Sequence, residues 1–215
     1  GSFRVLSDFR QVISQSKDIA VPRWVGLTKS GEAQLHVFSD ASKRLYAASA
    51  NLRVKSERGI HSHLVAAKSR LVTPKLLPLN FGPRFELLGC FLAVKLAKCI
   101  LESLLPVFAP IPIYCWTDST ICLNWIRGNA FQHDVFIRNR LLYIQSANMC
   151  WSFVSTNDNP ADLPSRGVQS LSDLWWYGPE WLVRCESEWP LEPHNSDVEV
   201  CVSVTNVSCA VQWIV

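Results

Sequence analysis

The chain has 215 residues, which is long enough to bury one sizeable hydrophobic core and to carry an appendage. Its composition, 48% hydrophobic and 18% charged with nine tryptophans, excludes a disordered or low-complexity protein. A formal net charge of +3 is too small to indicate a general nucleic-acid-binding surface, so any such function must rest on local clusters of Lys and Arg.

Eight cysteines lie mostly in apolar segments and show neither a Cys-x-x-Cys pair nor alternation with histidine. This pattern predicts reduced core residues and argues against a zinc site. The longest apolar region is interrupted by Lys95, Lys98 and Glu102, so no membrane span is expected. The sequence has no secretory signal pattern. We therefore expect an intracellular protein, cytoplasmic or nuclear, that is not secreted.

The first part of the chain predicts a helix followed by three strands. An amphipathic helix is expected over residues 3–20, where apolar residues recur at helical spacing before Pro22. Residues 34–40 and 45–54 have strand patterns joined by a polar turn, which predicts a hairpin. A third, short strand is expected over residues 64–67.

A basic, proline-containing connection is expected after this third strand. It carries Lys68, Arg70, Lys75 and Arg84. A solvated loop is the simpler interpretation of these charges, and contact with nucleic acid is the alternative.

Pro83 opens the strongest predicted helix, because proline suits the first helical position and the apolar residues that follow form one broad face. Glu86 lies in the first turn of this helix. It either complements the helix dipole or points at the sheet. Gly89 and Cys90 follow on the same face, where small side chains let a helix approach a sheet closely. This feature supports the second interpretation, so the two interpretations are equally favoured.

Two predicted strands end on acids. The apolar run over residues 113–117 ends at Asp118, and residues 36–39 end at Asp40 in the same way. Each acid either caps a following helix or joins other carboxylates to hold a cation. Ser119 can cap the helix after Asp118, and a strand that ends on an acid occurs twice in the sequence. The pattern therefore favours two carboxylates presented side by side.

The middle of the chain predicts helices over residues 119–127 and 133–148, the second with Arg138 and Arg140 exposed. A strand is expected over residues 151–154.

Asn159, Pro160 and Asp162 then have the pattern of a helix N-cap, a first helical residue and a first-turn acid. The tryptophan-rich residues 174–182 predict an aromatic closure that packs a terminal element onto the core, with base stacking as the alternative.

The C-terminal part has no functional interpretation. Residues 186–197 have the composition of a linker. Residues 198–204 and 210–215 are expected to be edge strands or the start of a following region.

The order of strands and helices, with acids after the first strand, in the first long helix, after a later strand and in the last helix, resembles the ribonuclease H fold. The closer resemblance, over about residues 22–190, is to the ribonuclease H region of BEL/Pao-type retrotransposon polyproteins. The motifs that carry it are Phe38-Ser39-Asp40-Ala41-Ser42, Ala67-Lys68-Ser69-Arg70, Pro83-Arg84-Phe85-Glu86-Leu87, Trp116-Thr117-Asp118-Ser119, Asn159-Pro160-Ala161-Asp162-Leu163, Ser165-Arg166-Gly167 and the closure from Leu174-Trp175-Trp176 to Trp181.

The resemblance implies an α/β fold with a mixed central sheet, in which antiparallel hairpin strands and parallel strands are flanked by helices. It implies an N-terminal helix or connection over residues 1–30 and a ribonuclease H-like domain over residues 31–184. Residues 185–215 would be a C-terminal extension or the start of the following region.

By the same resemblance, Asp40, Glu86, Asp118 and Asp162 form the catalytic set and hold two Mg²⁺ or Mn²⁺ ions. Asp40 would bridge the ions, Glu86 and Asp118 would bind the ion near the leaving group, and Asp162 would bind the ion that carries the attacking water. Clustered carboxylates repel one another without cations, and two ions can stabilise both the attacking and the leaving oxygen of phosphodiester hydrolysis.

This set implies an endonuclease that cuts the RNA strand of an RNA/DNA hybrid during reverse transcription, beside a reverse transcriptase domain of the same polyprotein. Its place would be a cytoplasmic retroelement particle or the nucleus. The alternative is a domesticated domain, catalytically weak or inactive, that serves as a protein- or nucleic-acid-binding scaffold. An integrase-like or resolvase-like nuclease fits the Asn159–Asp162 motif and the paired tryptophans poorly.

Three features depart from the ribonuclease H pattern. Residues 155–159 contain no histidine, Pro164 falls where it would disturb the hydrogen bonding of the last helix, and no separate basic protrusion is evident. Hybrid binding is therefore expected to rely on dispersed cations. They are Lys43, Arg44, Lys68, Arg70, Arg84, Arg138 and Arg140.

Overall fold

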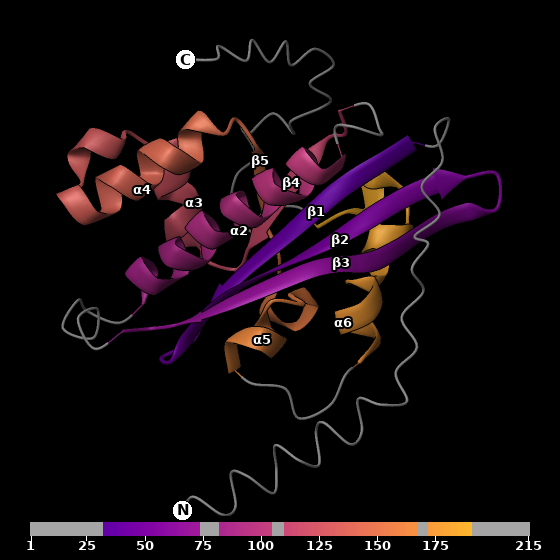
Figure 1. Cartoon of the computed structure of the whole chain (residues 1–215), viewed down its shortest axis with the longest axis horizontal. Helices are drawn as coiled ribbons and strands as arrows, with labels where there is room; N and C mark the ends of the chain where they lie inside the picture. The colour runs from indigo at the N-terminus through magenta and orange to yellow at the C-terminus, as the bar shows by residue number, and fades with distance from the viewer. Residues whose placement is uncertain (1–31, 74–81, 105–109, 167–171, 191–215) are drawn as a thin grey trace, which may run out of the picture.

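A five-stranded mixed sheet forms the centre of the molecule (Figure 1). The structure, a computed structural model, describes residues 32–73, 82–104, 110–166 and 172–190. The strand order is β3-β2-β1-β4-β5. The strands are β1 (Glu32–Ala41), β2 (Leu45–Ser56), β3 (Gly59–Leu71), β4 (Ile113–Thr117) and β5 (Cys150–Phe153). The first three strands are antiparallel, whereas β4 and β5 run parallel to β1, so the predicted mixed sheet is confirmed.

One face of the sheet is covered by the long helix α2 (Pro83–Leu104) together with α3 (Thr120–Arg127), η1 (Ala130–Gln132) and α4 (Val135–Ser146) (Figure 1). Leu35 and Val37 of β1 point into this larger core. Phe38 points to the opposite face, because successive side chains of a strand alternate.

Short elements cover that opposite face. They are η2 (Thr156–Asp158), α5 (Asp162–Arg166), α6 (Asp173–Tyr177), η3 (Glu180–Val183) and η4 (Glu186–Glu188). Trp181 and Leu182 are buried there against Phe38 and Trp116, which confirms the predicted packing role of the aromatic closure. A buried Trp181 offers no platform for base stacking, and for the half-buried Trp175 and Trp176 that alternative stays a prediction.

β3 is much longer than the strand expected over residues 64–67. It pairs with β2 over its whole length, from Gly59 opposite Ser56 to Leu71 opposite Leu45. The polar residues of this edge strand hide the alternation in the sequence, because much of its surface stays in contact with solvent. Lys68 and Arg70 therefore lie on a strand and not on a connection.

α4 is shorter than the helix expected over residues 133–148. The Asp134 side chain accepts hydrogen bonds from the backbone N–H groups of Phe136 (2.9 Å) and Ile137 (3.2 Å), which fixes the start of the helix. At the other end Asn148 adopts a positive φ of 48°, a conformation that does not continue a right-handed helix.

Other predictions have mixed outcomes. Cys90, Cys115 and Cys122 are buried free thiols as expected, but Cys99 and Cys185 are exposed. None of the helices in the described ranges combines the length and apolarity that a bilayer crossing demands. The helix expected over 3–20, Lys75 and the strands expected over 198–204 and 210–215 lie outside the described residues.

Arg53 holds the C-terminal elements against the sheet. Its buried guanidinium donates to the carbonyl oxygens of Leu182 (2.8 Å) and Arg184 (2.9 Å) and to Oε1 of Gln34 (2.8 Å). Glu186 lies 3.9 Å away and also accepts from Gln34 at 2.5 Å. These contacts attach η3 and η4 to β1 and β2.

A ring cluster completes this attachment. The fully buried His36 stacks on Tyr114 and meets the edge of Trp189, with ring centroids 5.1 and 5.0 Å apart. Glu186 and Trp189 therefore contact residues of the sheet, so residues 186–189 are attached to it and do not form the start of a free linker. The domain boundary between residues 184 and 185 stays a prediction.

We predict that Arg53→Ala destabilises the fold by about 2–4 kcal/mol, because it leaves the buried carbonyl group of Leu182 and the partly buried one of Arg184 without this donor. Urea unfolding measures this loss. Lys55→Ala is the matched control, since Lys55 follows on the same strand but is exposed, and its ion pair within the described ranges is with the exposed Glu32. Equal effects of the two substitutions would contradict the assigned role of Arg53.

Gly89 sets the distance between α2 and β1. A Cβ atom at this position would lie 2.9 Å from the backbone oxygen of Asp40, a contact that backbone atoms cannot relieve by rotation. We predict that Gly89→Ala destabilises the fold by about 1–3 kcal/mol, although the same change in an open helix stabilises by about 1 kcal/mol. Cys99→Ala, at an exposed position of α2, is the control in the same urea titration. A stabilised Gly89→Ala variant would refute the close approach.

Candidate metal centre

Asp40 lies near the end of β1 and is only 4% exposed. The Ser165 hydroxyl donates a hydrogen bond to its carboxylate, and the Ser42 hydroxyl in turn donates to the Ser165 carbonyl at 2.5 Å. Burial raises the pKa of Asp40 to about 6, with further increases from the charges of Asp118 and Asp162, against the opposing hydrogen bond from Ser165. Asp40 is thus held in place, but its charge is poorly compensated.

Glu86 reaches the same place from the first turn of α2. The small Gly89 one turn later lets the helix lie against the Asp40 backbone, so the glutamate points at the sheet as the sequence suggested. Its buried Oε2 atom has no hydrogen-bond partner among the described residues. Burial, followed by the charges of Asp40 and Asp118, raises the pKa of Glu86 to about 9. A dipole-complementing surface acid would not be buried in this way.

Asp118 follows the last residue of β4. The parallel register pairs Ser39 with Thr117, so Asp40 and Asp118 leave adjacent strands at the same edge. Capping is not the function of Asp118, because the Ser119 side chain accepts from the Cys122 N–H and caps α3. Burial raises the pKa of Asp118, opposed by a 2.8 Å hydrogen bond from the Thr156 hydroxyl.

Asp40, Glu86 and Asp118 converge. Each offers a carboxylate oxygen, and the three oxygens lie within 4.8 Å of one another. Carboxylate oxygens are the ligands that Mg²⁺ and Mn²⁺ prefer, and a partnerless buried oxygen on Glu86 is a group that a cation would satisfy. The residues present therefore fit a divalent metal ion.

Asp162, the fourth predicted acid, lies beside this three-acid cluster and outside it. It is the first residue of α5, and its carboxylate is 2.6 Å from Nε of Arg166. The Ser165 hydroxyl, which donates to Asp40, also donates to the Asp162 carbonyl oxygen at 3.0 Å. After burial, the charge of Asp162 adds to the raised pKa values of Asp40 and Asp118. Arg166 lies beside the carboxylate, but Oδ1 of Asp162 has no hydrogen-bond partner among the described residues.

Asn159 makes the predicted capping contacts at the turn that leads into α5, although the helix itself begins at Asp162. Its side chain accepts from the Ala161 N–H at 3.1 Å, and its carbonyl oxygen accepts from the Asp162 N–H at 3.1 Å. The same side chain donates to the backbone oxygen of Ser39 at 3.0 Å. These bonds attach the loop before α5 to the end of β1. Pro164 falls in the first turn of α5, where no intrahelical donor is required, so the expected disturbance of the helix is wrong.

Sequence reasoning missed three positioning contacts. They are those of Thr156 with Asp118, of Asn159 with the Ser39 backbone and of Ser165 with Asp40. Ser165 was recognisable only as part of the Ser165-Arg166-Gly167 motif, which carried no assigned contact. The hydroxyl of Thr156 had no local signal, because its partner Asp118 is 38 residues away in the chain.

The predicted nucleic-acid-binding residues lie in several places. Lys43 and Arg44 are exposed at the turn between β1 and β2, near the acids. Arg84 pairs with Asp134 at 2.8 Å. Arg138 and Arg140 were expected to be exposed, but both are half-buried.

Contacts with Phe136 explain why Arg140 is half-buried. Its guanidinium lies 3.5 Å from the centroid of the Phe136 ring, and it also donates to the Phe136 carbonyl at 2.7 Å. Burial lowers the pKa of Arg140 from its usual value. Contact with the ring therefore removes part of the side chain from solvent.

Comparison with solved structures shows low sequence identity. LC11-RNase H1 in complex with an RNA/DNA hybrid is 11% identical, with 61% of this chain and 91% of that chain covered and a TM-score of 0.37. The N-terminal RNase H domain of a Mycobacterium tuberculosis protein is 13% identical, with 62% and 89% covered and a TM-score of 0.38. The foamy viral protease-reverse transcriptase in complex with dsDNA is 14% identical, with 69% of this chain and 29% of that chain covered and a TM-score of 0.36.

No curated protein sequence matches the chain. A family model does: that of the Pao retrotransposon-like RNaseH-like domain matches residues 4–119, more than half of the 215 residues. The matched segment contains Asp40, Glu86 and Asp118, the three acids that converge. The resemblance stated from the sequence is confirmed, and the chain belongs to the Pao retrotransposon-like RNaseH-like domain family.

Proposed function

We propose that the chain is a divalent-metal-dependent endonuclease that hydrolyses the RNA strand of RNA/DNA hybrids. The observation that carries this proposal is the approach of Asp40, Glu86 and Asp118 to within 4.8 Å at one edge of the sheet. Membership of an RNaseH-like family supports the choice of reaction. Reverse transcription is the proposed setting, with a reverse transcriptase domain of the same polyprotein as partner.

Asp40 is proposed as the central ligand, because it is the most buried of the three acids and hydrogen bonds from Ser165 and the Ala41 N–H orient it. Glu86 and Asp118 flank it from α2 and from the end of β4. When bound, two Mg²⁺ or Mn²⁺ ions supply charge stabilisation for the attacking and leaving oxygens at phosphorus. The protein's own contribution is to hold the carboxylates in place before substrate arrives.

Asp162 is proposed as the ligand on the side of the attacking water. Its pair with Arg166 opposes this role only weakly, since the arginine side chain is 63% exposed and such surface ion pairs contribute little. Asp162 can therefore exchange Arg166 for a cation without a large loss of stability.

The alternative function is a domesticated scaffold that binds protein or nucleic acid without turnover. The pairing of Asp162 with Arg166 is the observation that favours it, because an engaged fourth acid leaves three carboxylates for two ions. Cleavage measurements separate the two functions.

We predict that the chain cleaves a labelled RNA/DNA hybrid with Mg²⁺ or Mn²⁺ and that Asp118→Asn lowers the rate by at least about 100-fold, because it removes a charged ligand. Denaturing electrophoresis of the labelled RNA measures the rate, beside a duplex-DNA control. Asp173→Asn, at an exposed first-turn acid of α6, is the matched variant and should retain activity. Hybrid that binds but stays intact with either metal would reject the enzyme in favour of the scaffold.

The raised pKa of Glu86 predicts a pH-dependent stability. Its usual value is 4.5 and its value in the fold is about 9, so the folded state holds a proton that the unfolded state releases over this range. Without divalent metal, stability should therefore fall as the pH rises between about 4.5 and about 9.

Glu86→Gln removes the ionisation, so the variant should lose less stability than the wild type over this range. Thermal unfolding at several pH values in EDTA measures the difference. Saturating Mg²⁺ or Mn²⁺ should raise the melting temperature of the wild type at high pH more than that of Glu86→Gln. Parallel pH profiles for the two proteins would show that Glu86 is not a buried, uncompensated acid.

A further inference from the structure

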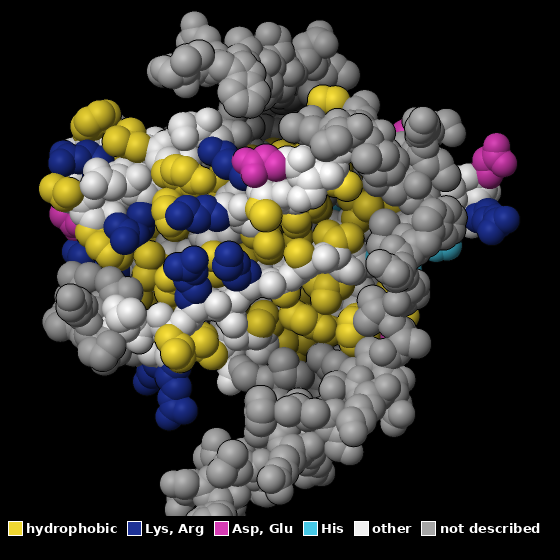
Figure 2. Space-filling model, in the orientation of Figure 1, with side chains coloured by type: hydrophobic (Ala, Val, Ile, Leu, Met, Phe, Trp, Pro, Cys, Tyr) yellow, Lys and Arg dark blue, Asp and Glu magenta, His cyan; other side chains and the backbone are white. Residues whose placement is uncertain are grey.

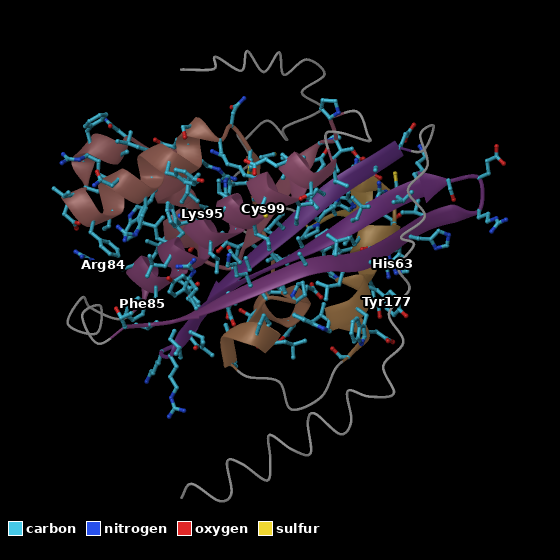
Figure 3. All side chains as sticks on the ribbon, viewed as in Figure 1. His63, Arg84, Phe85, Lys95, Cys99 and Tyr177 are labelled. Carbon is cyan, nitrogen blue, oxygen red and sulfur yellow. The ribbon has the colours of Figure 1, made fainter. Side chains whose placement is uncertain are left out.

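Lys and Arg side chains gather on the helix-covered side of the molecule (Figure 2). We call this surface the basic face. Its residues are Lys68 and Arg70 on β3, Arg84, Lys95 and Lys98 on α2, and Arg140 on α4. Arg84 and Lys95 appear together on this side of α2 in Figure 3.

The register of β3 explains why a strand contributes to this face. Lys68 pairs with Ala48 of β2, and Arg70 pairs with Tyr46. Ala48 and Tyr46 pack into the same core as α2. Because directly paired residues of antiparallel strands point to the same side of a sheet, Lys68 and Arg70 lie on the side of α2.

Most of this charge is not neutralised. Within the described ranges, no carboxylate forms an ion pair with Lys68, Arg70, Lys95 or Lys98. Arg84 is the member paired with an acid, Asp134. A surface with this excess of positive charge attracts polyanions.

Aromatic rings hold several of the cations. The Lys95 ammonium lies 4.8 Å from the centroid of the Phe91 ring, and the Lys98 ammonium lies 4.5 Å from that of Tyr143. Together with Arg140 over Phe136, these contacts order the long side chains, which reduces the entropy lost when a ligand binds.

The same contacts indicate which part of a nucleic acid would bind. Rings that lie beneath cations are not available for base stacking, the usual device for holding single strands. The exposed cations of this surface, Lys68, Arg70 and Lys95, instead suit phosphates, which a duplex presents on its outside.

The part of the basic face formed by Lys95 and Lys98 lies away from the metal centre, whereas Arg84, Lys68 and Arg70 lie nearer to it. Lys95 and Lys98 follow Glu86 by nine and twelve residues, which corresponds to about 14 and about 18 Å along the helix axis. Glu86 points at the sheet, whereas Lys95 is exposed. One short hybrid segment at the acids would therefore not account for this surface.

We propose that the basic face is a second nucleic-acid contact surface, which binds the phosphate backbone of the hybrid duplex beyond the segment held at the acids. The proposal rests on the proposed function in one respect, the identity of the partner as an RNA/DNA hybrid. The contact is electrostatic and independent of base sequence.

Fluorescence anisotropy of the whole chain tests the proposal. The probe is a labelled hybrid of about 24 base pairs in EDTA, so that neither cleavage nor metal-mediated binding contributes. The double variant Lys95→Glu, Lys98→Glu should reduce the slope of log affinity against log salt concentration by about 2 and weaken binding about tenfold or more.

The matched control is Lys55→Glu, Arg58→Glu, which makes the same charge change at exposed positions of the β2–β3 hairpin. It should weaken binding less than about threefold, through net charge alone. Lys95→Gln, Lys98→Gln should lower affinity to an intermediate value, and thermal unfolding of all variants excludes loss of fold as the cause.

Equal losses for the two charge-reversal variants would overturn the proposal, as would single-stranded RNA that competes as well as the hybrid. Cleavage is measured separately on a hybrid of about eight base pairs with Mg²⁺ or Mn²⁺, and the Lys95→Glu, Lys98→Glu variant should cut it at more than about half the wild-type rate. Absence of cleavage by the wild type, with binding that depends on Lys95 and Lys98, would reject the enzyme and retain the basic face. Cleavage by the wild type, with hybrid binding that Lys95→Glu, Lys98→Glu leaves unchanged, would retain the enzyme and reject the basic face.

Discussion

The close contact of α2 with β1 at Gly89 is the constraint on which the site depends. A side chain there would meet the backbone of Asp40 at 2.9 Å, so only glycine lets the helix lie at this depth. The depth in turn decides where the first turn of α2 ends and therefore where Glu86 points. Asp40 and Asp118 are brought together by the parallel register of β1 and β4, which the packing of α2 does not alter. A helix placed slightly farther out would leave two acids together and the third apart.

The convergence has an energetic consequence. Burial raises the pKa values of all three acids, with further increases from neighbouring carboxylates, and the pKa of Glu86, about 9, means that this group resists ionisation at neutral pH. Hydrogen bonds from Ser165 and Thr156 offset part of this cost. The rest of the domain must supply the remaining stabilisation free energy, and it does so through two hydrophobic cores on opposite faces of the sheet. Local instability in a well-packed scaffold is typical of functional sites.

Local patterns in the sequence were sufficient for the acids themselves. Asp40 and Asp118 each follow a short apolar run that predicts a strand. Two adjacent parallel strands that end on acids place the carboxylates side by side at one edge of the sheet. Glu86 was left between two interpretations, because the first turn of a helix explains an acid equally well. The distance between α2 and β1, a tertiary quantity, decides between them.

The contacts that orient the acids were not predictable in this way. Ser165 and Asp40 are 125 residues apart, and Asn159 and Ser39 are 120 residues apart. A hydroxyl or amide has no periodic signal, so nothing in its neighbourhood announces a distant partner. β3 was underestimated for a related reason, since a solvent-facing edge strand lacks the apolar alternation that marks strands in sequence. The half-buried Arg140 likewise depends on the Phe136 ring one helical turn away, a contact that charge alone does not suggest.

The attachment of the C-terminal elements by Arg53 bears on where the chain tolerates a break in its backbone. Arg53 donates to the backbone of residues 182 and 184, and Trp189 covers the ring of His36. Cleavage of the chain between Trp181 and Trp189 would detach Trp189 from the rings of His36 and Trp181 and expose aromatic surface that it now covers. The short elements up to Trp189 therefore depend on the sheet for their packing, and the buried rings of the sheet depend on them.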